Sequence, residues 1–253
     1  PLLFISLFFK NTFYELHDFP ESKFWFFRSL FRRVRWMLIH NKWKIQKFKE
    51  VFKLDTKKVI HKPNAVEISD FDISISKDEA RTKLKLPKDK FIIVYTGHLY
   101  GWKGVDTLLG TAAILKGVDI YIVGGSGENR ANIKFFGSRP HEEIPLWLRA
   151  ADVLVLPNTG KQKVSLYYTS PMKMFEYMAS GTPIVASRIP SITEILSEKN
   201  AFFAEADDPK SFAEGINYAL EHADDSARIS KSALEDVRQY TWHERALKIS
   251  KLF

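Results

Sequence analysis

A stretch of fifteen residues, TSPMKMFEYMASGTP (169–183), begins with side chains that suit an anion-binding helix end. Pro171 suits the first helical position, and Thr169 or Ser170 suits the cap before it. The N–H groups of a first helical turn have no partner within the helix, so they attract anions such as phosphate. Lys173 would add a positive charge to the same turn. The stretch therefore predicts an anion site at the start of a helix.

Glu176 follows about one and a half turns further along this helix. A carboxylate there cannot favour a phosphate by direct contact, but it can accept two hydrogen bonds from a vicinal diol such as a ribose. A phosphate at the helix start and a ribose further along together describe a nucleoside diphosphate. A capped helix with Glu176 on a solvated face has the same spacing, so this stretch alone leaves both interpretations open.

A second segment, YTGHLYGWKGVD (95–106), joins a predicted strand to a predicted helix. In open α/β sheets, ligands bind at the carboxyl ends of the strands, against helix N-termini. The strand ends at Gly97, where glycine lets the backbone approach a ligand closely, and the helix begins near Gly104. Lys103 at the helix entrance could meet an anion. A plain loop with a solvated lysine is the alternative at this junction.

The composition and the motifs exclude several other chemistries. The segment IVGGSGENR (122–130) lacks the third glycine of a dinucleotide fingerprint because Arg130 occupies that position, so it predicts at most a glycine turn near a ligand. The chain has no cysteine, which excludes disulfides, thiolate metal sites and a cysteine nucleophile. It also has no HExxH, Walker lysine or GxSxG motif. Its histidines are isolated in the sequence, so we predict neither a metal site nor a cofactor.

These segments belong to a regular pattern that starts at about residue 59. Short β-branched or aromatic runs alternate there with amphipathic runs of helix length, which is typical of a parallel sheet covered on both faces. We therefore predict a doubly wound, Rossmann-like α/β domain. The predicted strands are 91–97, 119–125, 133–137, 153–157, 183–187 and 201–206. The predicted helices are 104–116, 142–151, 170–180, 208–222 and the segment to residue 253.

The segment before this pattern is aromatic and basic. Residues 21–33 and 42–53 are predicted as helices, whereas 35–40 fits either a strand between them or part of one long helix. The opening run PLLFISLFF (1–9) is too short to cross a bilayer, which needs about 20 apolar residues, and no basic region precedes it as in a signal peptide. We interpret it as a piece of a folded domain whose beginning is missing.

Proline and asparagine in HKPNAV (61–66) predict a turn and a domain boundary. We therefore divide the chain into three parts. They are residues 1–61, a truncated remainder of an N-terminal domain; residues 62–240, the ligand-binding domain; and the C-terminal helical segment of residues 241–253.

The net charge of +8 is concentrated in residues 22–49, which contain nine Lys and Arg and no Asp or Glu. Aromatic side chains alternate with these cations. The segment is interpreted as a truncated core with a solvated basic face or as a surface for an anionic membrane, to which each Lys or Arg contributes about 1 kcal/mol. No recognised nucleic-acid module accompanies the charge, so we predict no nucleic-acid partner.

Three blocks of sequence occur in a fixed order within residues 58–253. They are YTGHLYGWKGVDTLL, FFGSRPHEEIPLWLRAADVLVLPN and SPMKMFEYMASGTPIVASRIPSITEIL. Together they resemble the C-terminal half of glycosyltransferase family 4, of GT-B fold. FYELHD (13–18) and the helices after it are similar to the end of that family's N-terminal domain.

The resemblance implies transfer of a sugar from a nucleoside diphosphate, of UDP or GDP type, to an acceptor hydroxyl. It further implies retention of the anomeric configuration without a metal, and an acceptor that is a glycan or is lipid-linked, as in cell-envelope synthesis. By the same resemblance, residues 1–61 belong to the acceptor-side domain and 62–240 form the nucleotide-sugar-binding domain. The helix of 241–253 resembles the family helix that packs back on the N-terminal domain. The implied location is cytoplasmic, or peripheral on the inner face of the cytoplasmic membrane.

The resemblance also assigns roles to single residues. Lys103 would contact the diphosphate, Glu176 the ribose hydroxyls, and His17 would lie close to the transferred sugar; these three are the predicted catalytic residues. The main chain near Ser138 and Arg139 would meet the base. The remaining residues predicted to bind the donor are Gly97, His98, Thr169, Ser170, Pro171, Met172 and Lys173.

Three features depart from the family pattern. The family often has two glutamates separated by seven residues, but Tyr168 replaces the first of them here. His98 replaces a basic residue that commonly follows the first glycine, and histidine is mostly uncharged near pH 7. Most of the N-terminal domain is absent. These departures leave two alternatives, a nucleotide-sugar-binding fragment or subunit without catalysis, and a sugar-nucleotide epimerase of the same fold.

Overall fold

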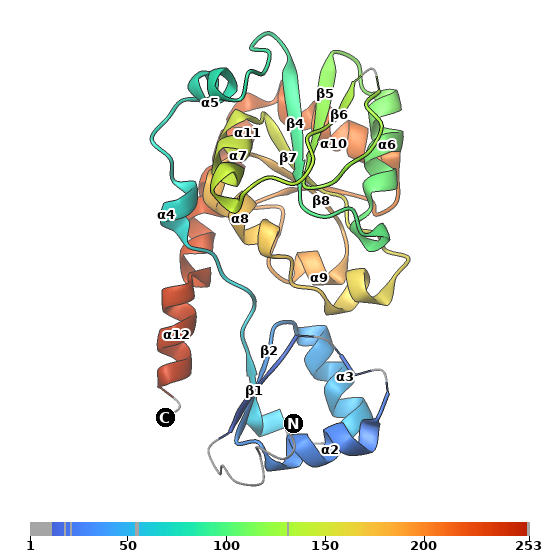
Figure 1. Ribbon diagram of the computed structural model, residues 1–253, viewed down its shortest axis with the longest axis vertical. Coiled ribbons are helices and arrows are strands. Elements are labelled where there is room, and N and C mark those ends of the chain that lie inside the picture. Colours follow the sequence, from blue (N-terminus) through green and yellow to red (C-terminus); the bar gives the residue numbers. More distant parts are fainter. Residues whose placement is uncertain (1–11, 18, 21, 54–55, 131, 252–253) are drawn as a thin grey trace.

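The computed structural model describes residues 12–17, 19–20, 22–53, 56–130 and 132–251, and within them the chain forms two parallel sheets (Figure 1). The larger sheet has six strands in the order β6-β5-β4-β7-β8-β9. Its strands are β4 (Phe91–Thr96), β5 (Val118–Val123), β6 (Ile133–Phe135), β7 (Val153–Leu156), β8 (Ile184–Ser187) and β9 (Phe202–Ala204). All six predicted strands are confirmed, each within two residues at either end.

Helices cover both faces of this sheet, as the continuous apolar strands predict. Along β4, Ile92 and Val94 pack into one core cluster, whereas Ile93 and Tyr95 pack into the other. The first cluster lies under α7 (Ile144–Ala150), α8 (Met172–Ser180) and α11 (Ala223–Asp236). The second lies under α6 (Val105–Ile114) and α10 (Pro209–Glu221). The domain is therefore doubly wound.

The smaller sheet contains β1 (Phe13–Leu16), β2 (Trp36–Ile39) and β3 (Val59–His61) in that order. Helices α2 (Phe24–Arg33) and α3 (Lys42–Phe52) pack on it and share a separate apolar cluster with its strands. Both helices agree with the prediction. The ambiguous segment 35–40 forms a strand, because three of the four β2 side chains are buried between the neighbouring strands and the helices.

Two segments connect the sheets. Residues 62–67 lead from β3 toward the short helices α4 (Ile68–Phe71) and α5 (Lys77–Lys83), and Val66 forms a bridge with Thr241. Helix α12 (Trp242–Ser250) then runs back beside the smaller sheet (Figure 1). There Arg245 Nη2 lies 2.5 Å from Glu15 Oε1 on β1. The last helix thus contacts the N-terminal part, as the resemblance implies.

A helix that crosses a bilayer needs about 20 predominantly apolar residues. None of the helices in the described ranges is both long enough and apolar enough to cross a membrane.

Candidate functional site

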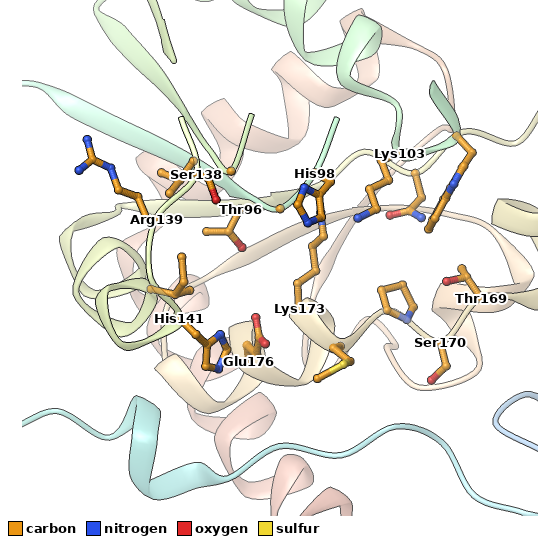
Figure 2. Close-up of a pocket in the computed structure, with 18 residues that line it drawn as sticks. Thr96, His98, Lys103, Ser138, Arg139, His141, Thr169, Ser170, Lys173 and Glu176 are labelled. Carbon is orange, nitrogen blue, oxygen red and sulfur yellow. The ribbon is translucent and has the colours of Figure 1, made fainter. Parts of the chain in front are cut away.

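A cavity of about 540 Å³ opens at the carboxyl ends of the strands in the larger sheet (Figure 2). Thr96 is the last residue of β4, Val123 is the last residue of β5, and Asn158 follows β7 closely. The start of α8 closes the opposite side. The cavity therefore occupies the place at which open α/β sheets bind their ligands.

Two lysines converge on one wall of this cavity, at Gly97 (Figure 2). A Cβ atom added to Gly97 would lie 3.3 Å from Lys173 Nζ and 3.8 Å from Lys103 Nζ. Gly97 itself has φ of +115°, which strongly favours glycine. This glycine thus leaves room for two ammonium groups beside the main chain.

Lys173 is buried, and its Nζ has no hydrogen-bond partner among the described residues. The ammonium lies 3.6 Å from the centre of the Tyr95 ring, a cation–π contact. Burial, and then the charge of Lys103, hold the pKa of Lys173 well below its ordinary value. Burial also lowers the pKa of Lys103. A buried and a half-buried cation side by side disfavour each other's charge, so an anion bound between them would be stabilised by both.

Glu176 lines the same cavity and does not lie on a solvated face. Burial raises the pKa of its carboxyl, while His141 and Lys173 act in the opposite direction. The ring of His141 lies beside the carboxylate (Figure 2) and packs on Phe71 at 6.0 Å between ring centres. Glu176 lies at one end of the cavity, and Thr169 and Ser170 lie at the other (Figure 2). Its carboxylate can therefore accept hydrogen bonds from the polar part of a ligand at that end.

The start of α8 differs from the prediction in one respect. Pro171 is the N-cap and not the first helical residue, and no side chain within the described ranges caps this helix. The Ser170 hydroxyl instead accepts a hydrogen bond from the backbone N–H of Asn64 at 3.3 Å, so it is turned away from the helix. The first N–H groups of α8 therefore remain without a side-chain cap, as an anion site requires.

Two further glycines allow the close packing behind the cavity. A Cβ on Gly104 would lie 1.7 Å from the carbonyl oxygen of Pro157, and a Cβ on Gly124 would lie 2.8 Å from the backbone of Gly97. Both glycines have positive φ, of +70° and +114°. The GlyGly turn after β5 thus has a packing role, and its main chain lines the cavity.

The structure brings almost all the predicted donor-binding residues to this one cavity. The lining includes Gly97, His98, Lys103, Ser138, Arg139, Thr169, Ser170, Pro171, Met172, Lys173 and Glu176. Sequence reasoning missed Thr96, Trp102, Val123, His141, Ile144 and Asn158. Their positions near the end of a predicted strand or near the start of a predicted helix were the signal that could have found them.

His17 is the predicted residue that does not line the cavity. It follows β1, and its side chain is 71% exposed. Its ring lies 4.8 Å from that of His40, so the two histidines are neighbours despite their separation in the sequence. With Glu15 they place three potential ligand atoms within 4.8 Å of one another. Arg245 already binds Glu15 in this cluster, and its positive charge disfavours a metal cation there.

Comparison with known proteins identifies the family of this chain. The profile described as "Glycosyl transferases group 1" matches residues 90–222, which is more than half of the chain. The chain belongs to the group 1 glycosyltransferases. The matched region contains every strand of the larger sheet and all of the predicted cavity residues.

Curated relatives share this part of the chain at low identity. The D-inositol 3-phosphate glycosyltransferase 1 of Catenulispora acidiphila is 27% identical over 197 residues, which cover 66% of this chain and 45% of that protein. The D-inositol 3-phosphate glycosyltransferase of Mycolicibacterium smegmatis is 25% identical over 185 residues, covering 66% and 41%. The chain thus spans less than half the length of either relative.

Solved structures confirm the GT-B fold. A sucrose-phosphate synthase from Thermosynechococcus elongatus superimposes with a TM-score of 0.78 at 20% identity, covering 95% of this chain and 66% of the other. Anabaena HepE, solved in complex with UDP-glucose, gives a TM-score of 0.80 at 20% identity, covering 96% and 71%. The match extends over both sheets.

Proposed function

We propose that this chain is the donor-binding part of a glycosyltransferase that moves a sugar from a nucleoside diphosphate to an acceptor hydroxyl. The observation that carries the proposal is the pair of ammonium groups beside Gly97, from the buried Lys173 and the half-buried Lys103. The uncapped start of α8 adds N–H donors to them, and Glu176 lies within the same cavity. This order of groups matches a diphosphate followed by a ribose.

In this proposal the diphosphate is the leaving group. Negative charge accumulates on it as its bond to the anomeric carbon breaks. The acceptor oxygen forms the new bond to that carbon and gives up its proton to an oxygen of the departing diphosphate. Lys103, Lys173 and the N–H groups of α8 stabilise that charge. These groups could act without a metal, and we propose retention of the anomeric configuration.

The donor base is proposed to lie near the main chain of Ser138 and Arg139. In Figure 2 the Arg139 guanidinium points away from the other labelled side chains, and its Nε donates to the Phe136 carbonyl at 3.0 Å. Base recognition would therefore use the backbone. Because HepE was solved with UDP-glucose, UDP is the first nucleotide to test, followed by GDP.

The acceptor is proposed to bind on the side of the smaller sheet, where His17 lies. A glycan or lipid-linked acceptor fits the surface of α2, on which Trp25 is 76% exposed beside exposed arginines. Such a surface could bind anionic lipid through charge and aromatic contact. We therefore propose an enzyme of cell-envelope glycan synthesis that works in the cytoplasm, at the inner face of the cytoplasmic membrane.

One observation favours a second function, nucleotide-sugar binding without transfer. Tyr168, which replaces the first glutamate of the family pattern, stacks on Phe19 at 5.8 Å between ring centres. That position therefore contributes an aromatic contact to the N-terminal part in place of the carboxylate of the family pattern.

The test is to incubate the full-length protein with UDP-glucose or a GDP-sugar and a lipid-linked glycan acceptor, and to look for a glycosylated product by mass spectrometry. A new product whose anomeric configuration matches the donor supports the proposal. Binding without transfer supports the second function. Isomerised sugar from donor alone would instead show an epimerase.

A further inference from the structure

The segment just before α8 is held from outside its own domain. The carbonyl of Thr169 accepts a hydrogen bond from Asn41 Nδ2 at 3.0 Å, and the carbonyl of Ser170 accepts one from Asn64 Nδ2 at 2.6 Å. Asn41 follows β2 of the smaller sheet, and Asn64 lies in the connection between the sheets. Two asparagines therefore hold the segment that leads into the uncapped helix start.

Each asparagine is fixed by a second hydrogen bond at its other end. Asn41 is 1% exposed, and its Oδ1 caps α3 by accepting from the N–H groups of Trp43 and Lys44 at 2.9 and 3.3 Å. Asn64 Oδ1 lies 2.8 Å from Nδ1 of His40, which must donate to it. Because both oxygens are engaged, both NH₂ groups have to point at the carbonyls before α8.

The neighbouring aromatic residues are held in the same way. Tyr168 stacks on Phe19, and Tyr167 packs against Trp43 at 5.5 Å between ring centres. The N-terminal part contacts this segment at Tyr167, Tyr168 and Thr169, and Asn64 of the connection contacts it at Ser170. The main chain cannot move there without breaking contacts to the N-terminal part.

The rest of α8 is anchored independently. Met174, Phe175 and Tyr177 are fully buried in the core of the larger domain. Loss of an asparagine contact would therefore loosen the first turn of the helix and leave the remaining turns in place. That first turn carries Lys173 and the free N–H groups.

We propose that Asn41 and Asn64 are positioning residues for the anion site at the start of α8, which rests on the proposed function of that site as a diphosphate site. They touch no ligand themselves. They fix the carbonyls of Thr169 and Ser170 so that the following N–H groups and the Lys173 ammonium face the cavity. By linkage, nucleotide binding and docking of the smaller sheet must strengthen each other equally.

Matched variants separate this role from general stability. Asn41→Ser keeps a good N-cap for α3 but has no amide to reach Thr169, and Asn64→Ala removes the donor to Ser170. The control is Glu194→Ala, since Glu194 also joins the two parts but does so through His61 at 2.7 Å and the backbone N–H of Lys42 at 3.1 Å, and not through the carbonyls before α8.

Two readouts are needed, and both use the full chain. Calorimetric titration with UDP and GDP should show binding weaker by about fivefold or more in Asn41→Ser and Asn64→Ala, the lower end of the usual range of coupling between sites. Hydrogen exchange of the peptide covering residues 170–176 should be faster in both variants without nucleotide. The exchange of β4 should stay unchanged, so that any fall in the midpoint of thermal unfolding reflects only the hydrogen bonds lost at Asn41 or Asn64. Glu194→Ala should leave the affinity and the exchange of 170–176 as in the parent.

The outcomes are distinct. Unchanged affinity in both asparagine variants, with or without faster exchange, would overturn the inference. An equal loss in Glu194→Ala would also overturn it, because docking in general would then be responsible. If neither the parent chain nor the full-length protein binds UDP or GDP, the proposed function fails. Unchanged hydrogen exchange of residues 170–176 in the two asparagine variants would show separately that the asparagines do not position the helix start.

Discussion

Replacing Lys173 by methionine should weaken nucleotide binding and stabilise the empty protein at the same time. The ammonium is buried without a hydrogen-bond partner among the described residues, and its pKa is lowered by burial and by Lys103. A hydrogen bond to a charged group is worth about 1.5–3 kcal/mol. The dissociation constant for UDP or GDP should therefore rise about 10- to 150-fold.

The Lys173→Met variant should gain stability because the ammonium that it removes is buried without a hydrogen-bond partner among the described residues. An unpartnered buried donor costs about 1–3 kcal/mol, and more when charged, whereas the contact with Tyr95 returns about 0.5–2 kcal/mol. The net gain of about 1 kcal/mol should raise the midpoint of thermal unfolding by about 2–4 °C in a chain of this size. Methionine fits the space because it is also long and unbranched.

The lowered pKa of Lys173 also determines how the stability of the protein changes with pH. Between the lowered pKa of folded Lys173 and the ordinary value in the unfolded chain, the unfolded state binds a proton that the folded state has lost. Stability of the parent protein should therefore rise with pH through that interval, and Lys173→Met should lack this rise. The advantage of the variant is largest at low pH.

Thermal unfolding followed by circular dichroism, together with calorimetric titration, checks both effects. The exposed Lys116 supplies the control, since Lys116→Met should change neither quantity. Tight nucleotide binding by Lys173→Met would remove Lys173 from the site. A less stable variant at low pH would show that the ammonium is satisfied in the folded protein, and would refute the reasoning from burial.

Three further predictions concern the carboxylate, a glycine and the basic helix. Glu176→Ala should weaken nucleotide binding by about 1.5–3 kcal/mol. Because burial raises the pKa of this carboxyl, the affinity of the parent protein for nucleotide should rise as pH increases through that pKa. Calorimetric titrations of the variant at several pH values should lack this rise in affinity. Gly104→Ala should destabilise the protein by about 2 kcal/mol or more, as measured by denaturant unfolding, because its Cβ would overlap the Pro157 carbonyl. Gly117→Ala, with φ of +71° but open space around it, should cost only about 1–2 kcal/mol, so equal losses would contradict the steric argument. Reversal of three exposed arginines on α2 to glutamate should lower binding to anionic vesicles in a sedimentation assay while nucleotide affinity stays unchanged, and a parent protein that ignores such vesicles would end the membrane proposal. These arginines are Arg28, Arg32 and Arg33.

The strands of the larger sheet were predictable because their apolar runs are uninterrupted and need cover on both faces. Segment 35–40 was ambiguous for the opposite reason, since four apolar residues fit a helix or a strand equally until their neighbours in space are known. Lys103 and Glu176 could be found from their positions at strand-to-helix junctions. Their roles as diphosphate and ribose ligands stay predictions.

Contacts between segments far apart in the chain could not be predicted from the sequence. Asn41 and Thr169 are separated by 128 residues, and Asn64 and Ser170 by 106, so no local pattern links them. The cap of α8 was placed one residue too early because Thr169 and Ser170 are good capping residues, and these outside contacts engage the segment instead. His17 illustrates the reverse case, as a residue assigned by resemblance that lies outside the cavity.

Calorimetric titration of this chain and of the full-length protein with UDP, GDP and ADP, with and without EDTA, tests the central claim most directly. We predict clear binding of one of these nucleotides, UDP before the others, that EDTA leaves unchanged and that Lys173→Met weakens. Binding of none of the three by either protein, or binding that EDTA abolishes, would contradict a donor site built from two lysines and a helix start.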